Sequence, residues 1–77
     1  MLSRNEFVKA LFKEYCEFEE EYLKEDDVAL CLLYAGRQSA LSDILNRYFK
    51  VFITRDKNNE PVLVDMHLDE EENNASK

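Results

Sequence analysis

The first part of the chain alternates hydrophobic and polar residues with the period of an α-helix. Large hydrophobic side chains recur at spacings of three and four, which places them on one stripe. They are Phe7, Leu11, Tyr15, Phe18 and Tyr22. Ser3 followed by Glu6 is typical of a capping box, in which the hydroxyl and the carboxylate satisfy each other's backbone N–H groups. We therefore predict a helix from Arg4 to about Lys24.

The next hydrophobic run, Val28–Ala35, is short and apolar on most sides. Either aspartate of the preceding Glu-Asp-Asp run can cap a helix here. Gly36, the only glycine, is typical of the left-handed residue just past a helix end. A buried strand is the alternative, because short apolar runs do not separate helix from strand. The Leu, Ala and Cys content favours a helix. Ser39 can cap a third helix, Ala40 to about Tyr48.

The C-terminal part alternates with period two, which is typical of strands. Residues 49–54 are aromatic and β-branched, residues 62–68 alternate, and residues 56–61 between them are rich in turn formers. These features predict a β-hairpin. Its inner face is expected to carry Phe49, Val51, Ile53, Val62, Val64 and Met66.

Phe52 and Leu63 would then lie on the outer face of the hairpin, where a monomer favours polar residues. Because a lone hairpin is marginally stable in water, we expect a second subunit or a partner to cover this face, and we expect a homodimer. The whole pattern predicts an α+β fold: an N-terminal amphipathic helix, one or two further short helices and a C-terminal β-hairpin. Residues 1–68 are expected to form a single compact domain. Residues 69–77, without hydrophobic content to fold around, are expected to form a disordered acidic tail.

Charge narrows the class of partner. The chain has 77 residues, with 17 acids against 10 lysines and arginines, for a net charge of −7. This charge disfavours direct binding to nucleic acid and to anionic membranes, and favours a basic protein as partner. The N-terminus lacks the apolar core of a signal peptide. The longest apolar run is far shorter than the ~20 residues that span a bilayer, so we expect a cytoplasmic location.

Most of the negative charge lies in one helical segment and in the tail. Residues 14–27 carry eight acids and one base, and residues 65–77 carry five acids and one base. A helix surface that only keeps a protein soluble mixes both signs, so this excess indicates a binding surface. Most acids of the helix fall opposite the hydrophobic stripe; Glu19 is the exception, because it falls near Phe12 and Leu23. The candidate partner-binding residues are Glu14, Glu17, Glu20, Glu21, Glu25, Asp26, Asp27, Asp69, Glu70 and Glu71.

Few residues offer catalytic or metal-binding chemistry. His67 is the only histidine, and two cysteines, Cys16 and Cys31, are too few for a disulfide framework or a zinc site. The segment Asp56–Glu60 faintly resembles the start of a calcium loop, but Pro61 and His67 stand where such a loop needs glycine and a bidentate glutamate. One glycine excludes the glycine-rich phosphate loops. We expect no enzymatic activity, no cofactor and no metal.

The acidic helix favours mimicry of DNA. Carboxylates four residues apart on a helix repeat about every 6 Å, comparable with the spacing of phosphates along a DNA strand, and Glu17, Glu21 and Glu25 form one such row. A dimer would supply a second row. With the cluster from Glu14 to Asp27 and the tail 69–72, the chain resembles small acidic bacteriophage proteins that block host DNA-binding proteins by mimicking DNA, such as inhibitors of the nucleoid protein HU.

The resemblance implies a homodimer that takes part in host takeover. It also implies competition with DNA for a basic, nucleoid-associated protein in the host cytoplasm. These proteins share no common fold, so the resemblance implies nothing about architecture.

The alternative is a small regulatory interaction module of the anti-sigma or polymerase-binding type. Apolar groups such as Phe52 and Leu63, together with exposed tyrosines, would then hold the partner, and the acids would set association rate and specificity. Salt dependence and competition by DNA separate the two hypotheses, because only mimicry predicts both.

Overall fold

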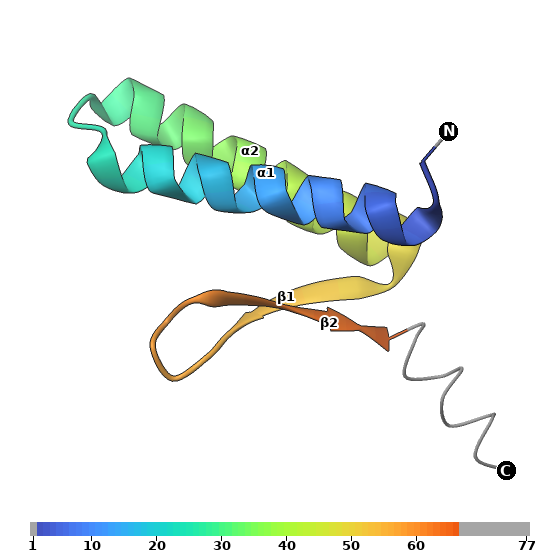
Figure 1. Ribbon diagram of the computed structural model, residues 1–77. Helices are drawn as coiled ribbons and strands as arrows, with labels where there is room; N and C mark the ends of the chain where they lie inside the picture. Colours follow the sequence, from blue (N-terminus) through green and yellow to red (C-terminus); the bar gives the residue numbers. More distant parts are fainter. Residues whose placement is uncertain (1, 67–77) are drawn as a thin grey trace, which may run out of the picture.

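A computed structural model describes residues 2–66 as two helices followed by a two-stranded antiparallel sheet (Figure 1). The predicted α+β class, with an N-terminal helix and a C-terminal hairpin, is confirmed. Helix α1 spans Arg4–Lys24, as predicted. The Ser3 hydroxyl accepts a hydrogen bond from the Glu6 backbone N–H at 3.2 Å and donates one to the Glu6 carboxylate at 3.1 Å. The carboxylate therefore binds the hydroxyl, where the capping box predicts a bond to the Ser3 backbone.

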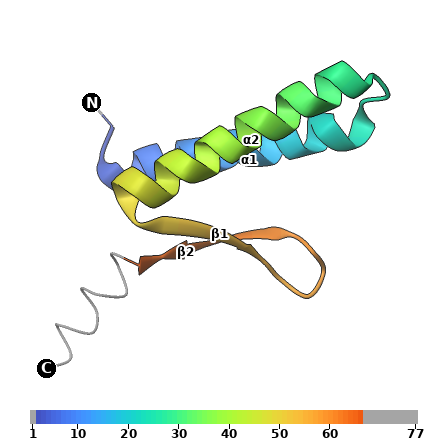
Figure 2. The same cartoon turned by 180° about the vertical axis from the view of Figure 1, so that it is seen from behind.

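The hydrophobic stripe of α1 is covered in its middle and open at its ends. Leu11, Tyr15 and Phe18 are partly buried, whereas Phe7 and Tyr22 are exposed. The partner that covers the stripe is mainly the second helix, which lies alongside α1 (Figures 1 and 2).

Helix α2 is one continuous helix, Val28–Phe49. The favoured prediction of a helix over the strand alternative is confirmed, but the predicted stop at Gly36 and restart at Ser39 are wrong. Gly36 does not adopt a positive φ. An interior glycine costs roughly 1 kcal/mol relative to alanine, and packing on α1 outweighs this cost because it continues on both sides. Before the glycine, Tyr34 stacks on Phe18, with ring centroids 6.3 Å apart. After it, the Gln38 amide donates to the Tyr15 carbonyl at 3.3 Å.

The end of α2 is set by a residue other than glycine. Lys50 is the C-cap, with a left-handed φ of 56°, and its backbone N–H donates to the Leu45 carbonyl. This conformation normally favours glycine. It turns the chain directly into the first strand.

The two helices run antiparallel, and the hairpin lies against one side of the pair (Figures 1 and 2). Each element contributes to a small core in which Val8 of α1, Leu45 of α2 and Val51 of β1 are 4%, 0% and 0% exposed. Partly buried hydrophobic residues surround these three: Leu11, Phe49, Ile53 and Leu63. The described part of the chain therefore has one core, where the helices meet the hairpin.

Strand β1, Val51–Arg55, pairs antiparallel with β2, Pro61–Asp65. Ile53 lies opposite Leu63, and both pack against the core. Phe52 lies opposite Val64 on the other face.

The predicted faces are right for β1 and wrong for β2. Alternation predicts Leu63 on the outer face, but it packs inside; Val62 and Met66, predicted inside, are exposed. The reason is the loop: the paired ends Arg55 and Pro61 leave five residues between them. A loop with an odd number of residues pairs odd-numbered residues of β1 with odd-numbered residues of β2. This register decides which side of β2 faces inward.

The loop at the end of the hairpin is fixed by its first residue. The Asp56 carboxylate accepts backbone hydrogen bonds from Asn58 at 2.8 Å and from Glu60 at 3.0 Å. Asn59 adopts a left-handed φ of 66°, which asparagine tolerates better than most residues. Asp56 thus stabilises the turn within its own loop.

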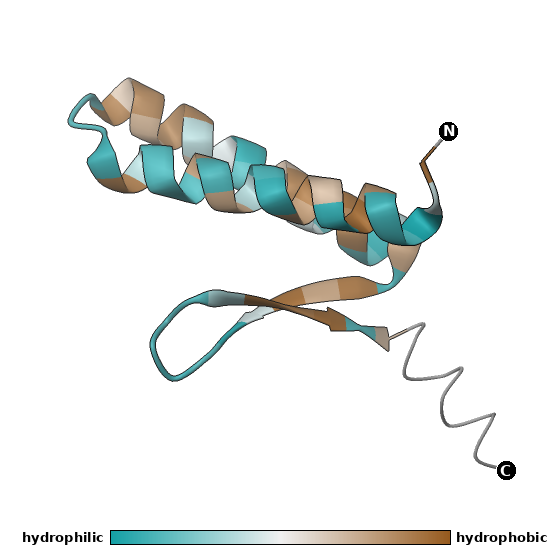
Figure 3. Cartoon of the chain, viewed as in Figure 1, coloured by the Kyte–Doolittle hydropathy of each residue, from teal (hydrophilic) through white to brown (hydrophobic). Residues whose placement is uncertain are grey.

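Much hydrophobic surface is left open. Among residues 2–66, three hydrophobic residues are buried, whereas 13 large ones are exposed. Figure 3 shows hydrophilic residues along α1 and hydrophobic residues at the start of α2 and along both strands. In this part of the chain no helix combines the length and hydrophobicity needed to cross a bilayer. Residues 67 and 68 of the predicted domain, and the predicted tail 69–77, lie outside the described residues.

Candidate functional site

The solvent side of α1 carries a row of carboxylates. Glu14, Glu17, Glu20 and Glu21 are exposed, and we call these four residues the acidic face of α1. They stand at helical positions away from Val8, which is buried in the core, and from Tyr15, whose backbone carbonyl accepts a hydrogen bond from Gln38 of α2. Within residues 2–66, none of the four takes part in a salt bridge. Their charges are therefore available to a partner.

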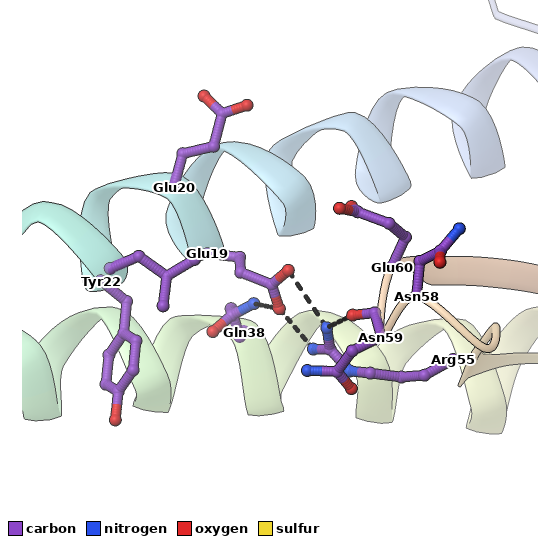
Figure 4. Close-up of a pocket in the computed structure, with 9 residues that line it drawn as sticks. Glu19, Glu20, Tyr22, Gln38, Arg55, Asn58, Asn59 and Glu60 are labelled. Carbon is purple, nitrogen blue, oxygen red and sulfur yellow. Dashed lines mark hydrogen bonds and ion pairs between the residues drawn. The ribbon is translucent and has the colours of Figure 1, made fainter.

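Glu19 is the acid of α1 that turns inward, as its misfit in the amphipathic pattern suggests. Both terminal nitrogens of the Arg55 guanidinium, at the end of β1, donate to its carboxylate, one of them at 3.1 Å. The Gln38 amide donates to the same carboxylate at 3.4 Å. Figure 4 shows Glu19 pointing at Arg55, whereas Glu20 points away. Glu19 therefore joins three elements and does not belong to the acidic face.

The ion pair holds both groups in their charged forms. The hydrogen bond from Arg55, with its positive charge, lowers the pKa of Glu19 and outweighs the opposing effect of burial. The same bond raises the pKa of Arg55. The charge of Arg55 is therefore paired with Glu19 and not with the carboxylates of the acidic face.

A cleft of about 520 Å³ opens between α1 and the hairpin loop. Glu19, Glu20, Arg55 and Glu60 supply its charged groups (Figure 4). Tyr22 and Leu23 supply hydrophobic lining. Three carboxylates against one guanidinium leave the cleft negative. It can therefore receive a basic side chain next to the acidic face.

Cys16 lies near this cleft and is held as a neutral thiol. Burial raises its pKa most, and the negative charges of Glu19, Glu20 and Glu60 raise it further. Since the thiolate is the nucleophilic form, Cys16 has weak nucleophilic character at neutral pH. Cys31 is also a free, partly buried cysteine, and its thiol donates to the Glu25 carbonyl at 3.2 Å.

The connection between the helices uses two of its three acids for structure. Asp27 is the N-cap of α2, and its carboxylate accepts from the Ala29 backbone at 2.8 Å and from Leu30 at 3.3 Å. Glu25 is the C-cap of α1, and its carboxylate accepts from the Asp27 backbone at 3.1 Å. Asp26 is exposed. The predicted row Glu17, Glu21 and Glu25 is therefore wrong at its last member, because the helix ends at Lys24.

Two further expectations concern metal binding and the acidic tail. Within the described residues, no group of three or more His, Cys, Asp or Glu side chains could hold a metal ion. The acids Asp69, Glu70 and Glu71 lie outside the described residues, as does His67.

The sequence did not reveal which distant residues hold the site together. Arg4 forms an ion pair with Asp65, with Nη1 and Oδ2 2.9 Å apart, and also donates to the Phe49 carbonyl. This fastens the start of α1 to the end of β2. Only the misfit of Glu19 signalled an inward partner, and nothing in the pattern identified Arg55.

Comparison of the chain with protein-family models, with curated proteins and with solved structures gives no match.

Proposed function

We propose that the protein binds a basic DNA-binding protein through the acidic face of α1 and competes there with DNA. The observation that carries this proposal is the row of exposed carboxylates on α1 that form no salt bridge within residues 2–66. Binding would need no rearrangement of these groups, because their charges already face solvent.

The charge spacing supports mimicry of a DNA strand. Residues 14–21 span about 10 Å of helix, because the rise is about 1.5 Å per residue. Four carboxylates over that length place one charge about every 3.5 Å of helix axis, close to the ~3.4 Å of duplex axis per charge of one DNA strand. A helix carries none of the base edges that encode sequence. The proposed target is therefore a protein that holds DNA mainly through its phosphates.

The acidic cleft supports the same target class. Glu20 belongs to the acidic face and also lines the cleft, together with Glu60 from the hairpin loop. A lysine or arginine of the partner can lay its charged end between these carboxylates and its aliphatic stem against Leu23, which is 74% exposed.

A pair of neutral variants tests the proposal. In Glu17→Gln/Glu21→Gln, two charges of the acidic face are removed, and glutamine has nearly the same helix propensity as glutamate. The control Glu6→Gln/Asp43→Asn changes the net charge equally but leaves all four residues of the acidic face and the carboxylates of the cleft intact, and glutamine is also found at the third position of a capping box. The probe is purified nucleoid protein HU, with lysozyme as a basic protein that does not bind DNA.

We expect HU to bind the wild-type chain, to release it steeply between about 50 and 200 mM salt, and to lose it when duplex DNA is added. The acidic-face variant should bind at least about tenfold more weakly than the control variant, because each lost contact to a charged group contributes about 1 kcal/mol or more. An affinity for HU that changes neither with salt concentration nor with added DNA would refute mimicry. Equal binding of HU and lysozyme would leave only non-specific charge attraction, which also contradicts the proposal.

A second candidate function is a module held by apolar contacts, and the hairpin favours it. Phe52, Val62 and Met66 are exposed there, and none of them packs in the core. Phe52→Ser removes the largest of these side chains. If this change abolished partner binding while Glu17→Gln/Glu21→Gln did not, the apolar module would be the function.

A further inference from the structure

The end of the helix pair, where α1 meets α2, carries three highly exposed aliphatic side chains. Leu23, Val28 and Leu32 are 74%, 73% and 69% exposed, and among the large hydrophobic residues of the described part of the chain only Tyr48 is more exposed. In Figure 1 both helices extend past the hairpin loop at this end, so the hairpin does not cover it. We call these three residues the apolar tip.

On α1, the apolar tip lies on the side that faces the hairpin. Leu23 follows Glu19 by four residues, so the two side chains are neighbours on the helix surface. The Glu19 carboxylate binds Arg55 of the hairpin. Leu23 also lines the acidic cleft between α1 and the hairpin loop, so the apolar tip and the cleft form one continuous surface.

On α2, the apolar tip lies on the same side of the helix pair. Cys31 comes two helical turns before Gln38, whose amide binds the Glu19 carboxylate. Val28 precedes Cys31 by three residues, and Leu32 follows Val28 by four, so each is a neighbour of the one before. Farther along this row Ser39 is exposed and polar. The apolar surface is therefore confined to the end of the helix pair.

The size of the apolar tip limits what can cover it. Its three side chains expose on the order of 200 Å² of apolar surface, if a fully exposed aliphatic side chain offers ~100 Å². A standard interface buries ~800 Å² per partner, so this surface is too small to hold a second copy of the chain. It is large enough for one or two inserted apolar side chains.

The charges around the apolar tip state what must accompany such a side chain. Glu20 comes three residues before Leu23 on α1, and Asp26 and Asp27 lie in the connection just before α2; all three acids are exposed. Residues 14–27 carry eight acids against one base. Charge complementarity therefore requires a partner in which lysines or arginines flank the apolar side chain.

We propose that the apolar tip receives the apolar wedge of a DNA-bending protein. Proteins of this class hold the minor groove with arginine and lysine and push an apolar side chain between two base steps. Their DNA site is an apolar slot flanked by phosphates, and this chain offers an apolar tip flanked by carboxylates. The inference rests on the proposed function, and it narrows the partner from basic DNA-binding proteins in general to those that carry a wedge.

A double-mutant cycle with HU tests this contact. In the chain, Val28→Gln/Leu32→Gln replaces two residues of the apolar tip by glutamine, which is a good helix former. The control Ile44→Gln/Tyr48→Gln makes the same change in another pair of exposed hydrophobic residues four apart, toward the other end of α2. In HU, the wedge residue is replaced by glycine. Circular dichroism checks that both variants of the chain keep their helices.

The variant of the apolar tip should bind HU at least about tenfold more weakly than the control variant, because two apolar side chains leave the interface. Its salt dependence should equal that of the wild type, because no charge is removed. The glycine variant of HU should bind the wild-type chain about tenfold more weakly than HU does. Against the variant of the apolar tip it should lose nothing further, since the two changes remove the same contact.

Two results would overturn the wedge site while leaving the proposed function intact. One is equal, salt-dependent binding of HU by the control variant and the variant of the apolar tip. The other is a pair of losses that multiply when both changes are combined, because independent sites behave in this way. A wild-type chain that shows no salt-dependent binding to HU would overturn both the wedge site and the proposed function.

Discussion

Glu19 and Arg55, 36 residues apart in sequence, join α1 to β1 through a two-pronged ion pair. Arg55 also donates to the Asn59 carbonyl at 2.9 Å, so the same guanidinium fastens the hairpin loop to the helix. One acid of α1 is thus used to place the hairpin. The four acids of the acidic face remain free of salt bridges within residues 2–66.

The ion pair should contribute measurably to stability. We expect Glu19→Gln to lower the free energy of unfolding by about 1 kcal/mol, because the pair is bidentate but still partly exposed to solvent. Urea titration followed by circular dichroism measures this change. Glu20→Gln, one residue away on the acidic face, should change the free energy by less than about 0.5 kcal/mol. Equal effects of the two variants would show that the pair contributes nothing beyond surface charge.

The same pair should make stability depend on acid pH. The hydrogen bond from Arg55 holds the pKa of Glu19 below its ordinary value of 4.5. A carboxyl with a lower pKa in the folded than in the unfolded chain adds stability above the unfolded pKa, and this contribution is lost as pH falls through the folded pKa. The difference in unfolding free energy between wild type and Glu19→Gln should therefore be constant from neutral pH to about 4.5 and shrink below it. A difference unchanged at about pH 3 would contradict this assignment.

The fold was predictable where the signal is local. The period of Phe7, Leu11 and Tyr15 and the cap at Ser3 define α1 without any knowledge of its neighbours. The interior of α2 was not predictable in this way, because Gly36 is a local stop signal overridden by distant contacts with α1. The register of β2 depends on the loop length, which alternation alone does not supply.

The candidate site was also predictable only where the signal is local. Helical spacing alone places Glu14, Glu17, Glu20 and Glu21 on the solvent side of α1. It cannot assign the partner of Glu19, because Arg55 comes close only through the fold. The predicted row of carboxylates continues past Lys24, but α1 ends there, and Glu25 and Asp27 act as helix caps.

The register of the hairpin gives a direct mutational test. Leu63 packs against the core, whereas Val62 lies on the exposed face. We expect Leu63→Ala to lower the free energy of unfolding by about 2 kcal/mol and Val62→Ala by less than about 1 kcal/mol. Urea titration of the two single variants measures the ranking. The reverse ranking would mean that the alternation had predicted the faces of β2 correctly.

Gly36 offers a stabilising substitution in the single chain. It lies inside α2 without a positive φ, and a Cβ there meets nothing within 4 Å. Gly36→Ala should therefore raise the free energy of unfolding by up to about 1 kcal/mol, because alanine restricts the unfolded chain and favours the helix. Thermal unfolding of the two proteins, followed by circular dichroism, measures this gain. A loss of stability there would mean that the helix is strained or interrupted at this position.

Asp27 belongs to the acidic cluster and also caps α2, and two substitutions separate these roles. Asp27→Asn removes the charge but keeps an oxygen that accepts hydrogen bonds from Ala29 and Leu30, and asparagine caps helices as well as aspartate does. It should change the free energy of unfolding by only a few tenths of a kcal/mol, through the helix dipole. Asp27→Ala removes both charge and cap and should lower it by about 1 kcal/mol.

The effects of Asp27→Asn and Asp27→Ala on HU binding should differ from their effects on the free energy of unfolding. If the Asp27 charge contributes to the partner surface, both variants weaken binding equally, although only the alanine variant is destabilised in urea titration. If binding falls only with Asp27→Ala, the residue acts through the start of α2 and not through its charge. In that case the partner-binding acids are confined to the acidic face of α1 and the exposed Asp26.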